Sequence, residues 1–270
     1  MHVRTFSNSA RPGVGLPPRR ESHRPLLPQH ARHCPVLEAG SALGYLVYPP
    51  LEPFESFFIG FYGEGRYQFI YYFKTETGDW APIFTVRTAL PVGGLGRAMQ
   101  EVDIKQRDVS MSREDALLLM RKFVVPDDFG TPPGAVTLRG ATNFRTSAGW
   151  DTVYVPVFNA IERPAPPMLV VRVETDWYMH ETEFRYVLQP GEGISGERSL
   201  PIGQVFFVPR EEITLGACTD EELEAMKRAD EEFGRAKAAN QVTTPYGIPY
   251  SPHYLKASRA RDEGEKEPSS

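Results

Sequence analysis

This sequence has few cysteines, no long apolar run and no large excess of charge of one sign. Only two cysteines, Cys34 and Cys218, occur in 270 residues, so a disulfide framework is excluded and free thiols are expected. No run approaches the roughly 18 consecutive apolar residues of a membrane-spanning helix. The formal net charge is −5 and no basic cluster is longer than Arg19-Arg20, which argues against nucleic acid as a partner.

The first residues also lack the apolar core of a secretory signal. We therefore expect a cytoplasmic protein, with neither nucleic acid nor a membrane among its partners.

Proline and aromatic residues are abundant, with 25 Pro, 16 Phe and 12 Tyr. Prolines interrupt helices and aromatic residues favour strands, so many short strands joined by turns are expected. The 41% of hydrophobic and 24% of charged residues are typical of a globular protein. A chain of this length is sufficient for one large β domain.

Hydrophobic periodicity divides the chain into four parts. Residues 1–24 mix Ser, Pro, Gly and Arg without either period, which predicts a flexible N-terminal arm. Residues 25–218 contain repeated strand patterns and are predicted to form a β-sandwich domain. Residues 219–240 are predicted to form a C-terminal helix, and residues 241–270 a docking arm followed by a mobile tail.

Capping signals predict two helices in this mainly β chain. Ser112 precedes an apolar run as an N-cap, which predicts a short internal helix over 112–123. Thr219 and Glu222 have the spacing of a capping box at the start of the C-terminal helix. The expected fold is an antiparallel β-sandwich of jelly-roll type with these two helices.

One short motif adds a resemblance to that expectation. The Pro-Ile-Gly sequence at 201–203 resembles the Pro-x-Gly part of a cupin motif, in which a metal-binding histidine follows. Phe206 stands at the position of that histidine. The resemblance implies a cupin-like shape without the standard cupin metal site.

The most concentrated set of polar side chains in strand-like sequence lies within 169–209. Strand alternation places Arg172, Glu174 and Asp176 on one face, and apolar or aromatic residues including Trp177 on the other. The polar face can line a cavity, or it can be the solvent face of an antiparallel sheet. Both interpretations stay open.

A turn-like block, Phe-Arg-Thr-Ser-Ala-Gly-Trp at 144–150, offers a guanidinium, hydroxyl groups and an indole. Arg145 is suited to hold a carboxylate or phosphate through two parallel hydrogen bonds. It is also suited to a structural ion pair with Glu174 or Asp176. The sequence therefore predicts a contact between Arg145 and one of these carboxylates.

Two groups of residues have some features of metal sites. His180 and Glu183 have a spacing compatible with one cation, but no His-x-His or His-x-Asp pair accompanies them, so they are only candidates and no metal is assigned. His30, His33 and Cys34 form a second cluster. A zinc ribbon needs a matching second pair, which the sequence lacks, so local packing is expected. A nucleophilic Cys34 assisted by His33 is the alternative, although neighbouring side chains in an extended segment point apart.

Sequence blocks between positions 25 and 209 follow one another in a distinctive order: Phe-Arg-Thr and Gly-Trp within 144–150, then Asn159, then Val-Glu-Thr-Asp-Trp at 173–177. In this order they resemble an uncharacterised bacterial family, labelled as a domain of unknown function, for which no activity is carried over. The resemblance implies that seven residues belong to one recurring assembly: Arg145, Thr146, Trp150, Asn159, Glu174, Asp176 and Trp177.

The first functional hypothesis is a small-molecule-binding, cupin-like protein, acting as an accessory enzyme of a biosynthetic pathway on an anionic substrate. Glu174 or Asp176 would act as base. This requires a carboxylate with a raised pKa in a concave pocket, and it fails if arginines consume both carboxylates. The expected substrate contacts are Arg145, Thr146, Trp150, Asn159 and Trp177.

Two alternatives come from other classes. One is a non-catalytic interaction or assembly protein whose aromatic strands and C-terminal helix contact partners, including a second copy of the chain. The other is a non-haem metal-dependent enzyme that uses His180, Glu183 and a remote histidine. The sequence specifies no cofactor.

Overall fold

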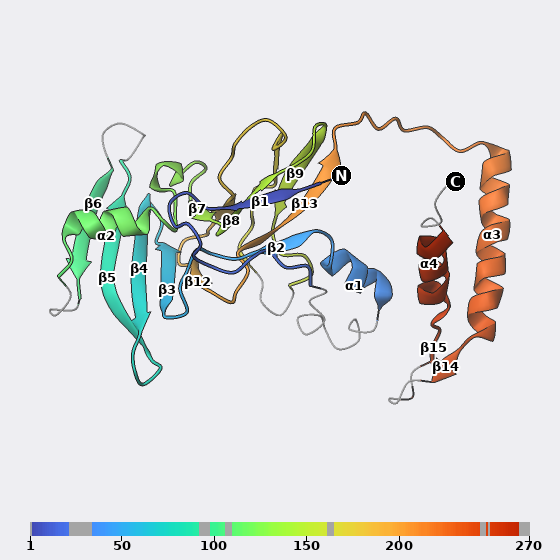
Figure 1. Cartoon of the computed structure of the whole chain (residues 1–270), viewed down its shortest axis with the longest axis horizontal. Coiled ribbons are helices and arrows are strands. Elements are labelled where there is room, and N and C mark those ends of the chain that lie inside the picture. The colour runs from blue at the N-terminus through green and yellow to red at the C-terminus, as the bar shows by residue number, and fades with distance from the viewer. Residues whose placement is uncertain are drawn as a thin grey trace. The chain divides into compact units, whose positions relative to one another are not determined.

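A computed structural model of the chain (Figure 1) describes residues 2–21, 34–91, 98–105, 110–160, 165–243, 247 and 249–264. His30 and His33 of the predicted His-Cys cluster lie outside the described residues. The chain divides into two compact units, residues 1–211 (unit 1) and residues 212–270 (unit 2). Unit 1 contains all the described strands except one short hairpin.

Unit 1 contains a five-stranded antiparallel sheet. In spatial order its strands are β12 (Gly193–Glu197), β3 (Glu55–Phe61), β4 (Arg66–Lys74), β5 (Trp80–Ala89) and β6 (Met99–Ile104). One face is rich in aromatic side chains because alternate residues of β4 are aromatic and β3 and β5 add further aromatic residues. Helix α2 (Arg113–Met120) packs against β5 and β6 (Figure 1). Phe123, just after α2, stacks on Phe57 and Tyr71 with ring centroids 5.5 and 5.6 Å apart.

A second sheet in unit 1 has four antiparallel strands. In spatial order these are β10 (Val171–Val173), β9 (Trp150–Val155), β13 (Gly203–Pro209) and β2 (Tyr45–Val47). Two further antiparallel pairs join β1 (Arg4–Ser7) to β8 (Thr142–Arg145), and β7 (Ala135–Arg139) to β11 (Glu183–Val187). The mainly β, antiparallel prediction is confirmed and is consistent with a β-sandwich. The jelly-roll connection stays a prediction.

Both predicted capping signals are present. The Ser112 hydroxyl accepts a hydrogen bond from the Asp115 amide at 3.0 Å, and α2 follows. Thr219 and Glu222 form a capping box at the start of α3 (Asp220–Ala239), with the Thr219 hydroxyl accepting from the Glu222 amide at 3.2 Å. These side chains satisfy backbone donors that would otherwise lack partners, so both predicted helices are confirmed.

The remaining elements are short. Unit 1 also has α1 (Pro35–Ser41) and the 3-10 turn η3 (Pro126–Asp128). Unit 2 adds β14 (Val242–Thr243), β15 (Pro249–Tyr250) and α4 (His253–Gly264) to α3. Helix α4 lies where the sequence predicted a mobile tail, and its His253 ring contacts Phe233 of α3 with ring centroids 4.9 Å apart. Among the described residues, no helix has both the length and the apolar character needed to span a lipid bilayer.

The N-terminal segment differs from the flexible arm predicted for residues 1–24. Its β1 pairs with β8, and the buried Asn8 donates a hydrogen bond to the Gly140 carbonyl at 2.9 Å. Arg11 forms a two-pronged ion pair with Glu55, at 2.5 and 3.0 Å, whose side chains are 13% and 5% exposed. Periodicity misses this anchoring because it depends on single polar residues whose partners lie far away in sequence.

Candidate functional site

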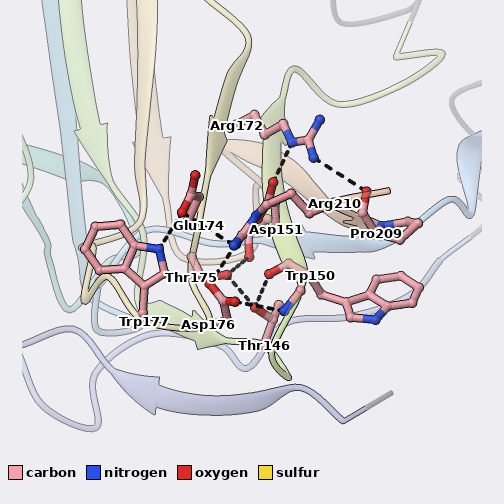
Figure 2. Close-up of polar contacts among 12 residues, drawn as sticks. Thr146, Trp150, Asp151, Arg172, Glu174, Thr175, Asp176, Trp177, Pro209 and Arg210 are labelled. Atoms are coloured by element: carbon pink, nitrogen blue, oxygen red, sulfur yellow. Dashed lines mark hydrogen bonds and ion pairs between the residues drawn. The ribbon is translucent and has the colours of Figure 1, made fainter. Parts of the chain in front are cut away.

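An ion-pair cluster lies on three adjacent strands, around the carboxylate of Asp151 (Figure 2). Asp151 is on β9, between β10 and β13, and its side chain is only 3% exposed. Arg172 of β10 donates from Nε to Oδ2 at 2.6 Å, and Arg210, just after β13, donates to Oδ1 at 2.5 and 2.9 Å. The sheet places these residues together because Asp151 pairs with Val208 and Arg172 pairs with Val153.

Arg210 extends the cluster to the two carboxylates predicted as bases. Its Nη2 lies 2.7 Å from Asp176 Oδ1 and its Nη1 lies 3.5 Å from Glu174 Oε2. The Gly149 amide donates to the other oxygen of Asp176 at 2.9 Å, and the Trp177 indole N–H donates to Glu174 (Figure 2).

The protonation of this cluster follows from its contacts. Burial acts to raise the pKa of Asp151, but hydrogen bonds from Arg210 and Arg172 outweigh it and hold the pKa below its usual range. Hydrogen bonds from Arg210 and the Gly149 amide likewise lower the pKa of Asp176. Asp176 is therefore ionised and paired at neutral pH, which does not fit the raised pKa required of a general base.

Arg145 does not make the predicted contact with Glu174 or Asp176. Arg210 occupies that role, with three carboxylate partners. Sequence reasoning missed Arg210 because the predicted strand ended at Pro209, and its position beside Asp151 depends on strand register. A signal for Asp151 was present, since it shares an alternating face with the buried Val153 and Val155.

A chain of three threonine hydroxyls lies beneath the cluster. The Thr175 hydroxyl is 3.0 Å from that of Thr146 and 2.6 Å from that of Thr152, and all three residues are buried. Thr146 also donates to the Trp150 carbonyl at 2.6 Å. The sequence predicted Thr146 as a ligand contact, but its hydroxyl group forms hydrogen bonds within unit 1.

Two other predicted ligand residues lie apart from any shared pocket. The Trp150 indole points away from the ion-pair cluster, on the opposite side from Trp177 (Figure 2). The Asn159 amide donates to the Ser41 hydroxyl at 3.0 Å and to the Leu37 carbonyl at 3.3 Å, so it fastens a loop to α1. Of the seven residues predicted to form one assembly, only some therefore lie close together in the structure.

The structure does bring Arg145 and Trp177 together at a small cavity of about 130 Å³, here called the Arg145 cavity. Arg145 is exposed and, among the described residues, has no ion-pair partner. Trp177 and Met179 are 66% and 72% exposed. The cavity is lined by Phe6, Phe144, Arg145, Thr175, Trp177, Tyr178 and Met179.

His180 and Glu183, the candidate metal ligands, have separate surroundings. The His180 ring stacks on Tyr178 with centroids 5.9 Å apart and meets the edge of Tyr154 at 5.8 Å, and burial lowers the pKa of His180. Glu183 lies 3.2 Å from Arg139, and burial raises the pKa of Glu183. In the described ranges, no group of three His, Cys, Asp or Glu side chains is placed to hold a metal ion.

A larger hollow of about 570 Å³ lies over β4, β5 and β6. Two arginines line it, and each already has a carboxylate neighbour. Arg66 is 3.2 Å from Glu64, and Arg87 is 3.5 Å from Glu101. Among the described residues that line it, this hollow therefore offers volume but no unpaired cation.

No model of a known protein family matches the chain, and no curated protein matches it. The resemblance to the uncharacterised bacterial family thus stays a prediction, and functional inference depends on the geometry above.

Proposed function

We propose that unit 1 binds a small molecule with an anionic group and an aromatic or apolar body in the Arg145 cavity. The observation that carries this proposal is the unpaired guanidinium of Arg145. The arginines of β7, β10 and β11, and the arginine just after β13, each have a carboxylate partner: Arg139, Arg172, Arg185 and Arg210. An exposed arginine without such a partner is suited to hold an external carboxylate or phosphate through paired hydrogen bonds.

The walls of the cavity support an aromatic or apolar ligand body. Trp177, Tyr178 and Met179 are consecutive and at least half exposed, although contact of such side chains with water is unfavourable. Contiguous exposed apolar side chains often mark binding surfaces. The volume of about 130 Å³ is below the ~300 Å³ of a typical ligand pocket, so one ring would be enclosed and the rest of the ligand would face solvent.

The two carboxylates beside the cavity support binding more than acid–base catalysis. Asp176 is held as an ionised partner of Arg210, and Glu174 accepts the indole hydrogen bond that orients Trp177. In this proposal Glu174 and Asp176 position the cavity wall. The same proposal includes a cupin-like connection of the sheets, a cytoplasmic location and membership of the uncharacterised bacterial family.

Calorimetric titration of the full chain with benzoate and phenylacetate tests the proposal. Both probes should bind, and Arg145→Gln should weaken them at least about tenfold, which corresponds to about 1.4 kcal/mol. Trp177→Ala should also weaken them, because it removes a wall. Arg66→Gln is the matched control, since it removes an exposed arginine elsewhere. Saturable binding of neither probe, or equal binding by the Arg145→Gln variant, would contradict the proposal.

A further inference from the structure

A second arginine stands beside the Arg145 cavity. In the β1–β8 pair, Arg4 lies directly opposite Arg145 and Phe6 directly opposite Asn143. Directly opposed residues of an antiparallel pair project from the same face, with Cβ atoms roughly 5 Å apart, and alternate residues share that face. Arg4, Phe6 and Arg145 therefore share one face of this ribbon, and two of the three line the cavity.

In the described part of the chain, the nearby carboxylates form no ion pair with either arginine of this pair. Arg4 is exposed and, like Arg145, has no ion pair with any residue in the described part of the chain. Glu181, on the same side of the ribbon, accepts from Asn143 at 2.8 Å and from the Ser9 amide at 3.3 Å. Glu174 and Asp176 are engaged by Trp177 and Arg210, as described above.

Two like charges directly opposite one another destabilise an antiparallel pair. Arg4 and Arg145 nevertheless lie opposite one another on β1 and β8, near aromatic side chains that are also exposed. An external anion with two negative charges removes the repulsion and satisfies both groups of donors. A single carboxylate has two oxygens and one charge, which one arginine can satisfy.

We propose that the Arg145 cavity is specific for a phosphate monoester of an aromatic or apolar alcohol, with Arg4 and Arg145 sharing the phosphate. This rests on the proposed binding function and names its ligand class. A phosphate monoester carries nearly two charges at neutral pH and three acceptor oxygens, enough for both guanidiniums. Its organic group lies against Trp177 and Phe6.

The test uses calorimetric titration of the full chain at pH 7.5 with phenyl phosphate, benzoate and inorganic phosphate. Phenyl phosphate should bind at least about tenfold more tightly than either of the others, because only it offers both the ring and two charges. Arg4→Gln should weaken phenyl phosphate about tenfold and change benzoate less than about threefold. Arg145→Gln should weaken all three probes, and Arg66→Gln none of them.

Two additional variants sharpen the test. Arg4→Lys keeps the charge but loses the planar donor fork, so its affinity for phenyl phosphate should lie between those of the wild type and Arg4→Gln. Trp177→Ala should weaken phenyl phosphate and leave inorganic phosphate unchanged. Arg4→Gln should not lower the thermal unfolding temperature, because Arg4 has no ion-pair partner among the described residues and the change removes its repulsion with Arg145.

The outcomes separate this inference from the function on which it rests. If Arg4→Gln binds phenyl phosphate as the wild type does, or if benzoate binds as tightly as phenyl phosphate, the inference is overturned while Arg145-dependent benzoate binding keeps the proposed function. Equal affinity for inorganic and phenyl phosphate overturns the ester assignment. Binding of none of the probes overturns both proposals.

Discussion

At the residue scale, Arg210 and Asp151 form the centre of the ion-pair cluster. Asp151 is nearly buried and receives donors from two arginines, whereas those arginines are 34% and 51% exposed. A buried carboxylate is tolerated only when charged donors replace its lost water. Because Arg210 also reaches Asp176 and Glu174, one guanidinium fixes the turn that presents Trp177.

Asp151→Asn should lower the free energy of unfolding by about 2–3 kcal/mol at pH 7, because it removes the buried partner of two arginines. The folded pKa of Asp151 is below its unfolded value, so the stabilisation is complete above pH ~4 and is lost as pH falls through the folded pKa. Urea unfolding at pH 7, 5 and 3 measures both effects: the difference between wild type and variant should shrink at pH 3.

Glu174→Gln is the comparison, because Glu174 is half exposed and its ion pair with Arg210 is long. Exposed pairs contribute little, so a change of less than about 1 kcal/mol is expected. An Asp151→Asn effect no larger than this would show that the buried carboxylate is not the centre of the cluster.

At the scale of elements, local signals predicted more than long-range ones. The abundance of aromatic residues predicted many short strands, and the caps at Ser112 and Thr219 predicted the starts of α2 and α3. Strand β1 has four residues and no clear alternation, so nothing local distinguished it from a flexible arm. Its existence depends on pairing with β8, about 140 residues later, which no window of sequence contains.

The same limit applies to the candidate site. Residue chemistry selected Arg145 and Trp177, and the structure places both on one cavity. Which cation meets Asp176 depended on strand register, and so did the position of Arg4. The sequence therefore indicated the right residue types but paired the wrong arginine with the carboxylates.

The N-terminal segment should depend on Arg11 for its attachment. Arg11→Met keeps an apolar stem near the Phe123 ring but leaves the buried carboxylate of Glu55 without its cation, so a loss of about 3 kcal/mol is expected. Hydrogen exchange should show faster exchange of the β1 amides. The matched change Arg66→Met removes a side chain that is 60% exposed and should have almost no effect. Equal exchange in the two variants would show that β1 is held by its backbone pairing alone.

At the scale of the whole molecule, the division into two units falls directly after the ion-pair cluster. All the residues of the Arg145 cavity and of the cluster lie before residue 212, and Arg210 is the last of them. The alternative function, assembly with a second copy, was predicted to involve both the aromatic strands, which lie in unit 1, and the C-terminal helix, which lies in unit 2. In α3, Leu223 and Met226 are 44% and 61% exposed, which leaves an apolar stripe open to solvent.

Two shortened chains separate these contributions. A chain that ends at Glu211 keeps the cluster, so its urea unfolding midpoint and its affinity for benzoate should match those of the full chain. A chain that ends at Pro209 loses only two further residues, but Asp151 and Asp176 lose Arg210, so its urea unfolding midpoint should be lower than that of the chain ending at Glu211. Equal stability of the two chains would show that Arg172 alone is enough to stabilise the buried carboxylate of Asp151. Sedimentation of the full chain and of the chain ending at Glu211 tests assembly through α3, because only the full chain should then self-associate.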